Sequence, residues 1–285
     1  MKTVFLIVNY NDYKTTIELI NNIKNYESID KILVVDNNST DNSFNEIKKY
    51  IVSNDKIEVI RNVANKGYGS GINFGAKYIK ETIGNCYLIV SNSDIVINKN
   101  EDIKELINTF DNETAIVAPI IKEHSGINRG WKIPTPFQDG LLNIIYIHRY
   151  LRPKLLFYKE DYYKKDVVDV EAVSGCFFAI NLEYLEKVDY FDENIFLYYE
   201  ENVIATKLKR INLKTKINTN VEVFHNHSVT IDKNINKIKK YKELKKSQMY
   251  FHRKYNNANI FEQSLLCITN KITLLILKIV YMIKK

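Results

Sequence analysis

The chain has 285 residues, of which 45% are hydrophobic and 26% charged, and its formal net charge is +7. These values are ordinary for a globular protein with a large core, built as one elaborated domain or as one domain with appendages. The three cysteines, Cys86, Cys176 and Cys267, lie far apart and show no CxxC spacing. This excludes a CxxC-type metal site or redox pair, and we expect buried thiols in a reducing compartment.

The net charge hides a strong asymmetry along the chain. Residues 207–285 hold 18 basic and 4 acidic side chains, a difference of +14, which leaves −7 for residues 1–206. An acidic body with a basic tail predicts that the tail meets an anionic partner, either a membrane surface or nucleic acid. A solvated lysine-rich helix is the alternative.

Apolar runs and helical spacings alternate over the first 121 residues. The first run, residues 3–8, is typical of a central parallel strand and too short for the core of a signal peptide, so we expect a cytoplasmic protein. Further strands are expected at 31–35, 56–60, 87–90 and 115–121, and helices at 15–25, 42–52, 69–82 and 103–110. The alternation predicts an α/β fold with a mostly parallel sheet and helices on both faces.

The regular alternation stops near residue 122. Residues 123–165 hold three of the four prolines and the single Trp131, and we expect an irregular excursion over one edge of the sheet. Later strands are expected at 167–171, 176–180, 214–217 and 221–224, and helices at 182–188 and 201–211. We expect a main domain at 1–228, with halves 1–121 and 122–228, and a helical tail at 229–285.

The tail is basic and then apolar. Residues 233–255 predict a long basic helix, and residues 261–285 an apolar one with Lys271, Lys278 and Lys285 seven positions apart, near one helix face. No uninterrupted apolar stretch approaches the roughly 18 residues that span a bilayer. The pattern favours a helix lying in the membrane interface, and a helix docked on the protein itself is the alternative.

Acidic residues follow three of the chain's apolar or aromatic segments: Asp36, Asp94, and the pair Glu200 and Glu201. Parallel strands end along one edge of a sheet, where open α/β folds bind ligands. We therefore expect these acids to converge on one cleft. The turn Ser91-Asn92-Ser93-Asp94 could also be a plain polar turn in which the aspartate caps the next helix.

Glycines are concentrated in residues 62–75, just before an expected helix. Such a loop permits close backbone approach to a ligand, and the helix N-terminus suits phosphate. The spacing does not match GxGxxG, because Ile72 stands three residues after Gly69. A dinucleotide fingerprint is therefore not supported.

Four segments, in this order, resemble the family 2 glycosyltransferases of the GT-A fold, particularly the rhamnosyltransferase-like branch. They are Val8-Asn9-Tyr10-Asn11, residues 34–41, Asn65-x-Gly67 with Asn73-x-Gly75, and the block of Ser174-Gly175-Cys176, Phe191-Asp192-Glu193 and Phe196-x-Tyr198-x-Glu200-Glu201. The resemblance covers residues 4–228. It implies a GT-A domain that transfers a sugar with inversion from a nucleoside-diphosphate sugar donor.

The resemblance also implies roles for individual residues. Asp36 would contact the base or ribose, and Asp94 stands at the DXD position, where it would hold Mg²⁺ or Mn²⁺ on the diphosphate. His225 occupies the place of a family histidine, near the metal or phosphates or as a structural imidazole. The implied donor-binding residues are Val8, Asn9, Asp36, Asn65, Lys66, Gly67, Asn73, Asn92, Ser93 and Asp94.

The catalytic base of the family falls at Glu201, which would deprotonate the acceptor hydroxyl, with Glu200 as a substitute. The family usually has Asp at this position and a further acid where this chain has Val203. Because the extra methylene moves the carboxylate, a weak or inactive sugar-nucleotide binder is the alternative. A nucleotidyltransferase is disfavoured, since no glycine occurs in Asn9-Tyr10-Asn11-Asp12 after the first strand.

These inferences combine into one expectation. The protein would act in surface polysaccharide synthesis, on a saccharide or lipid-linked saccharide acceptor facing residues 131–163. It would lie peripherally on the inner face of the plasma membrane, held by the tail, and nucleic acid is not expected as a partner.

Overall fold

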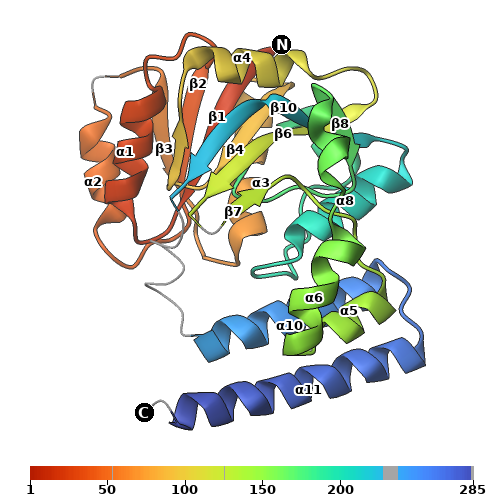
Figure 1. Cartoon of the computed structure of the whole chain (residues 1–285). Helices are drawn as coiled ribbons and strands as arrows, with labels where there is room; N and C mark the ends of the chain where they lie inside the picture. Colours follow the sequence, from red (N-terminus) through yellow and green to blue (C-terminus); the bar gives the residue numbers. More distant parts are fainter. Residues whose placement is uncertain (53, 125, 227–236, 284–285) are drawn as a thin grey trace.

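The computed structural model describes residues 1–52, 54–124, 126–226 and 237–283. Figure 1 shows a β-sheet with helices packed against it and a further layer of helices at one end of the molecule. The strands are β1 (Lys2–Asn9), β2 (Lys31–Asp36), β3 (Ile57–Arg61), β4 (Cys86–Ser91), β5 (Ile95–Ile97), β6 (Thr114–Glu123), β7 (Gly126–Asn128), β8 (Val167–Val170), β9 (Phe177–Asn181) and β10 (Lys214–His225). The helices are α1 (Tyr13–Ile23), α2 (Ser43–Tyr50), α3 (Tyr68–Thr82), α4 (Asn100–Asn108), α5 (Pro136–Leu142), α6 (Ile145–Leu156), α7 (Leu182–Lys187), α8 (Glu200–Arg210), α10 (Lys237–Lys254) and α11 (Ile260–Ile283), with a 3-10 turn η1 (Glu160–Lys164).

The core lies on both faces of the sheet. Successive strand side chains point to opposite faces, so β1 sends Leu6 into a cluster with α3 and Phe5 into a cluster with α1 and α2. Both side chains are fully buried. This two-sided burial explains the continuous apolar run of β1 and confirms the expected α/β sheet covered by helices.

The sheet is mostly parallel and contains one antiparallel strand at its centre. Within the described residues the strand order is β3-β2-β1-β4-β9-β6-β10-β5, with β7 beside β6 and β8 beside β10. β1 pairs in parallel with β2 and β4, while β9 runs antiparallel between β4 and β6. The boundary expected between residues 121 and 122 falls inside β6, and strands from both sides of it form this one sheet.

Two expectations for the second half of the chain are wrong. The strands expected at 214–217 and 221–224 are a single strand, β10, whose pairing with β6 shifts register between Asn218 and Glu222. The excursion at 123–165 contains helices. α5 begins with a capping box between Thr135 and Gln138 and has Pro136 in its first turn, a start signal that the proline content obscured.

The two expected tail helices are present as α10 and α11. The boundary expected at 228/229 and residues 233–236 of the basic helix lie outside the described residues. α11 packs on α5, where Gly140 leaves room for Leu265, because a Cβ at position 140 would lie 2.7 Å from the leucine Cδ2. Glu262, Lys271 and Lys278 interrupt the apolar stretch of α11 as expected, but residues 260–280 are nevertheless long and apolar enough to cross a membrane by length and composition.

A substitution of Phe177 tests how much the central strand β9 contributes to the stability of the core. It is fully buried and lies against Phe5, with ring centroids 6.1 Å apart. We expect Phe177→Ala to lower the free energy of unfolding by about 3–5 kcal/mol, because it leaves a cavity in the core. Urea unfolding measures this, with the exposed Val52→Ala as a control expected to change stability by less than about 0.5 kcal/mol.

Candidate active site

The first part of the site is the edge at which β1 and β2 end. Asp36 is fully buried and accepts hydrogen bonds from Asn9 Nδ2 at 3.0 Å and from the backbone N–H of Ser39 at 3.1 Å. Arg61 Nε lies 3.5 Å from its second carboxylate oxygen. Asn9 is equally enclosed, since its side-chain oxygen accepts from Thr16. These two predicted donor-binding residues are therefore in contact. One carboxylate oxygen of Asp36 bonds to Asn9 of β1, and the other bonds to Ser39 in the loop that follows β2.

The second part is the loop before α3. Gly67 has a φ of +115°, and a Cβ there would lie 2.2 Å from the carbonyl oxygen of Phe196, so a larger residue does not fit. The Asn65 side chain accepts from Gly67 N at 3.0 Å and fixes the turn, while Lys66 is exposed. The half-buried Val8 lies against Gly71 of α3. These predicted donor-binding residues therefore lie at or beside the N-terminus of α3.

Asn73 has a different environment from the other predicted donor residues. Its amide donates to the Phe191 carbonyl at 2.9 Å and to Glu193, and its oxygen accepts from the Phe191 N–H at 2.9 Å. It is buried within α3. Both polar atoms of the amide are engaged, so in this structure Asn73 joins α3 to the loop that precedes α8.

The third part is the turn between β4 and β5, which carries Asn92, Ser93 and Asp94. Antiparallel pairing of β5 with the end of β10 places His225 opposite Ile95. The imidazole therefore lies beside the turn, with its Nε2 3.1 Å from Asp94 Oδ1 and its Nδ1 3.3 Å from Glu123 Oε1. Asp94 and His225, the two predicted metal ligands, are thus in contact, and both are buried.

The electrostatics of His225 follow from these neighbours. Burial lowers the pKa of the imidazole, whereas hydrogen bonds to Asp94 and to the Cys176 thiol raise it, to about 11 in sum. The ring is therefore protonated at neutral pH. Glu123, at the carboxyl end of β6, had not been predicted for the site; its position after an apolar strand was the available signal.

The Asp94–His225 pair, called the metal corner below, could bind a divalent metal that also binds a substrate. Within the described ranges, no cluster of three or more histidine, cysteine and carboxylate side chains is arranged to hold a metal. One carboxylate and one imidazole facing each other are nevertheless suitable donors for Mg²⁺ or Mn²⁺, which commonly take their remaining ligands from phosphate and water. Metal binding would require the ring to lose a proton, because only a neutral imidazole nitrogen can coordinate a metal.

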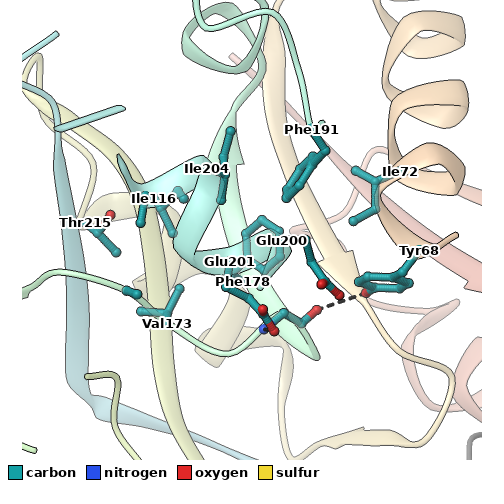
Figure 2. Close-up of a pocket in the computed structure, with 13 residues that line it drawn as sticks. Tyr68, Ile72, Ile116, Val173, Phe178, Phe191, Glu200, Glu201, Ile204 and Thr215 are labelled. Atoms are coloured by element: carbon teal, nitrogen blue, oxygen red, sulfur yellow. Dashed lines mark hydrogen bonds between the residues drawn. The ribbon is translucent and has the colours of Figure 1, made fainter. Parts of the chain in front are cut away.

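The fourth part is a small, largely apolar pocket at the head of α8. Figure 2 shows Glu200 and Glu201 directed into it beside Tyr68, with Phe178 and Phe191 among its lining residues. Glu201 Oε1 accepts from the Gly175 N–H at 3.2 Å, and the Tyr68 hydroxyl donates to the Gly175 carbonyl at 2.9 Å. Glu200 Oε2 is buried, and no partner for it is found among the described residues.

Both carboxyl groups are shifted towards the protonated form. Burial raises the pKa of Glu200 well above its usual value, and the charge of Glu201 raises it further. Burial also raises the pKa of Glu201, although the Gly175 N–H opposes this by bonding to the carboxylate. Neighbouring acids with raised pKa values in a pocket are suited to general acid–base chemistry near neutral pH.

One short segment links the carboxyl pair to the metal corner. Gly175 contacts Glu201, and the carbonyl of Cys176 accepts from the Asn92 N–H at 2.8 Å. Of the acids predicted from strand ends, Asp94 and Glu201 are therefore connected through residues 174–176, whereas Asp36 lies where β1 and β2 end. Tyr68 was not predicted; its place in the first turn of the glycine-rich helix was the signal.

Three comparisons identify similar proteins. The sequence model described as "Glycosyl transferase family 2" matches residues 4–189. The chain is 28% identical over 225 residues to the low-salt glycan biosynthesis hexosyltransferase Agl10 of Haloferax volcanii, covering 79% of this chain and 67% of that protein.

Two solved structures share the fold. GalNAc-T7 with UDP, GalNAc and Mn²⁺ superposes with a TM-score of 0.63 at 16% identity, over 81% of this chain and 44% of that one. The mannosyltransferase PcManGT of Pyrobaculum calidifontis with GDP-Man and Mn²⁺ gives a TM-score of 0.60 at 12% identity, over 96% and 72%. The chain thus spans less than half the length of GalNAc-T7. Both likenesses confirm the GT-A fold.

The raised pKa of Glu200 predicts a pH dependence of stability. A carboxyl group whose pKa is higher in the folded state stabilises the fold at low pH, and this contribution is lost as pH rises through the folded value. Between about pH 5 and pH 9, the stability of the natural protein should therefore fall relative to Glu200→Gln. Urea unfolding across this range measures the difference in the free energy of unfolding between the two proteins. For the control Glu18→Gln, at an exposed position, this difference should not change with pH. A difference that also stays constant with pH for Glu200→Gln would contradict the burial of Glu200.

Proposed function

Because the chain belongs to glycosyl transferase family 2, we propose that it transfers a hexose from a nucleoside-diphosphate sugar to a hydroxyl of a saccharide or lipid-linked saccharide. The reaction would invert the anomeric carbon. The rhamnosyltransferase-like branch of the family stays part of this proposal. The observation that carries it is the link through residues 174–176 between a buried carboxyl pair and a buried aspartate–histidine pair.

The carboxyl pair would act on the acceptor. Glu201 would take the proton of the acceptor hydroxyl while its oxygen bonds to the anomeric carbon and the bond from that carbon to the diphosphate breaks. The electron pair of the broken bond leaves with the diphosphate. Attack from the side opposite the leaving group produces the inversion. The raised pKa of Glu201 makes it a stronger base than an exposed glutamate.

The aspartate–histidine corner would act on the leaving group. Asp94 and His225 are the residues that would hold a divalent metal there, and the metal would neutralise charge on the departing diphosphate. The neighbouring Asn92 and Ser93, together with the loop before α3, would border the donor. The solved GT-A relatives carry Mn²⁺ with UDP or GDP-Man, which supports a divalent metal and a nucleotide sugar in this proposal.

Glu201 is the better candidate for the base, and Glu200 the second. Glu201 is oriented by the Gly175 N–H, whereas Glu200 Oε2 is buried without a partner among the described residues. The missing third acid also has a structural reason. Val203 is buried against Phe251 and Tyr255 of the tail, so its face of α8 is covered by α10.

The acceptor would belong to glycan synthesis at the cell envelope. The relative Agl10 is named as a hexosyltransferase of low-salt glycan biosynthesis, which supports a glycan acceptor. A lipid-linked acceptor would place the enzyme on the inner face of the plasma membrane, in contact through the tail. Residues 131–163, which include Trp131 bonded to Asn202 of α8, would lie on the acceptor side.

Three substitutions test this proposal. With a panel of nucleotide sugars and Mg²⁺ or Mn²⁺, we expect Glu201→Gln to lower the transfer rate about 10²- to 10⁴-fold. Glu200→Gln should have a smaller effect. Asp94→Asn should remove the metal-dependent rise in melting temperature that a bound donor produces, whereas Glu201→Gln should keep it.

The exposed Asp55→Asn and Glu18→Gln serve as matched controls, since each neutralises one acid outside the site. Full activity in both Asp94→Asn and Glu201→Gln would show that the site is assigned wrongly. Donor binding without turnover by the natural protein, on any acceptor offered, would instead favour a sugar-nucleotide binder.

A further inference from the structure

Helix α11 buries mainly polar residues and exposes most of its large apolar side chains. The residues that it buries against the protein are the fully enclosed Leu266 and the polar Thr269, Asn270 and Thr273, at 5%, 9% and 3% exposure. Large apolar side chains of the same helix are exposed: Ile260, Phe261, Ile268, Ile272, Leu275, Ile276, Ile279, Val280 and Met282. A surface helix of a globular protein normally does the opposite.

Specific hydrogen bonds fix this orientation. Thr273 Oγ1 donates to the Asn143 carbonyl at 2.6 Å, and Asn143 Nδ2 donates to Thr269 Oγ1 at 3.2 Å. The Tyr241 hydroxyl of α10 donates to the Asn270 carbonyl at 3.4 Å. Turning the helix to bury its apolar face would break these bonds, so the apolar residues face outward as a result of the packing.

The two tail helices are strongly basic. Residues 237–283 hold ten basic and two acidic side chains, a net charge of +8. Lys271 and Lys278 are exposed on α11 itself, and α6, which packs on α5, adds exposed Arg149, Arg152 and Lys154 without an acid. Apolar side chains beside clustered cations complement an anionic lipid surface, where headgroups attract the cations and the acyl region receives the apolar residues.

We propose that α11 lies in the interface of an anionic lipid bilayer and holds the protein to it, independently of the transfer reaction. A transmembrane position would require α11 to leave α5 and α10. Thr269 and Thr273 would then lose their hydrogen bonds to Asn143, and the polar side chain of Asn270 would enter lipid. Lying flat, the helix keeps every bond to the protein and buries only its outward face.

The proposal also sets the orientation of the active site. In Figure 1, α11 forms the outermost layer of the molecule, and β1 runs from the N-terminus towards that layer. The carboxyl ends of the parallel strands, and with them Asp36 and Asp94, are therefore on the end of the sheet nearer to the membrane. A soluble nucleotide sugar and a membrane-held acceptor could then meet at one edge.

Vesicle flotation of the full chain tests the proposal. We expect binding to phosphatidylcholine vesicles that contain phosphatidylglycerol, little binding to phosphatidylcholine alone, and weaker binding at high salt. The combined variant Ile268→Ser, Ile272→Ser and Leu275→Ser should lower the vesicle partition coefficient roughly tenfold or more. Its matched control, Val52→Ser with Ile127→Ser and Ile211→Ser, removes exposed apolar side chains elsewhere and should float like the natural protein.

Other occupants of the face give different results. If a second copy of the chain covers it, light scattering will show a dimer that the α11 variant dissociates and that vesicles do not bind. If α11 spans the bilayer, the protein will resist extraction from cell membranes by alkaline carbonate. Either result, or the absence of binding to anionic vesicles, overturns the proposal.

A separate set of contacts joins α10 to the loop that carries the carboxyl pair. Tyr198 and Tyr199, immediately before Glu200, have φ values of +67° and +69°, a backbone conformation that non-glycine residues rarely adopt. The Tyr199 ring lies beside Phe251, and its hydroxyl bonds to Asp139 and accepts from Gln248 Nε2 at 3.0 Å. Asp139 also bonds the buried His252.

The same helix holds other points of this loop. Ser247 Oγ donates to the Leu197 carbonyl at 2.8 Å. Asp192 accepts from Tyr250, Lys254 and Tyr255 through one carboxylate oxygen. α10 therefore contacts the loop that leads into α8 at three points: Asp192, Leu197 and Tyr199.

We infer that Tyr199 is a positioning residue for Glu200 and Glu201, an inference that rests on the proposed transfer reaction. Tyr199→Phe keeps the ring and removes the hydroxyl. We expect kcat to fall several-fold. The KM for the sugar donor should stay unchanged, because the substitution does not alter the metal corner at Asp94. Tyr241→Phe, which removes a tail hydroxyl that faces α11, should leave both constants unchanged.

An unchanged kcat in Tyr199→Phe, or an equal loss in Tyr241→Phe at similar stability, would refute the positioning role. The measurement begins from a natural protein with measurable transfer. A failure of the proposed function is therefore seen first, as absent turnover in the natural protein, and is not confused with a failure of this inference.

Discussion

Two adjacent carboxyl groups at the start of α8, Glu200 buried and Glu201 half-buried, are the constraint on which the surrounding structure depends. Burying an ionisable group is unfavourable unless bonds or charges compensate, and here few do. Glu201 accepts a hydrogen bond from the Gly175 N–H. Both glutamates lie in the first turn of α8, where the helix dipole favours negative charge. The left-handed tyrosines before them add about 1–3 kcal/mol of backbone strain each. Such an arrangement persists only if its neighbours hold it, and the loop, the 174–176 segment and α10 all contact it.

The tail therefore helps to hold the candidate site in place. Phe251 and Tyr255 cover the face of α8 that carries Val203, while Gln248 and Ser247 contact the loop before α8. α11 in turn packs on α5 and α10 with Leu265, Leu266, its threonines and Asn270, and leaves most of its large apolar residues outside. Layer by layer, the buried acids are connected to the outermost helix of the molecule through continuous contacts. Packed side chains and hydrogen bonds of this kind explain why the tail could not be treated as a separate unit.

Local patterns predicted most of the first half of the fold and less of the second. The apolar run of β1 and the helical spacing of α1 depend on burial that is uniform along the element, which a sequence displays directly. The pairing of β9 between β4 and β6 depends on contacts distant in the chain, and no local pattern contains it. In the site, strand ends pointed to Asp94 and Asp36, but the contact of His225 with Asp94 follows from the antiparallel pairing of β5, a three-residue strand too short to recognise. The inward polarity of α11 was hidden because its composition alone suggested either a membrane or a core helix.

The central place of β9 also has a consequence for synthesis of the chain. Only 22 residues separate the end of β4 from the start of β6, yet the two strands do not pair with each other, and both pair with a strand that ends at Asn181. A nascent chain shorter than this exposes two unpaired apolar strand edges at the middle of its sheet. Such edges readily pair with other chains. The ribosome must therefore deliver nearly two thirds of the protein before β9 can join β4 to β6, and protection of the nascent chain over that interval becomes part of making this enzyme.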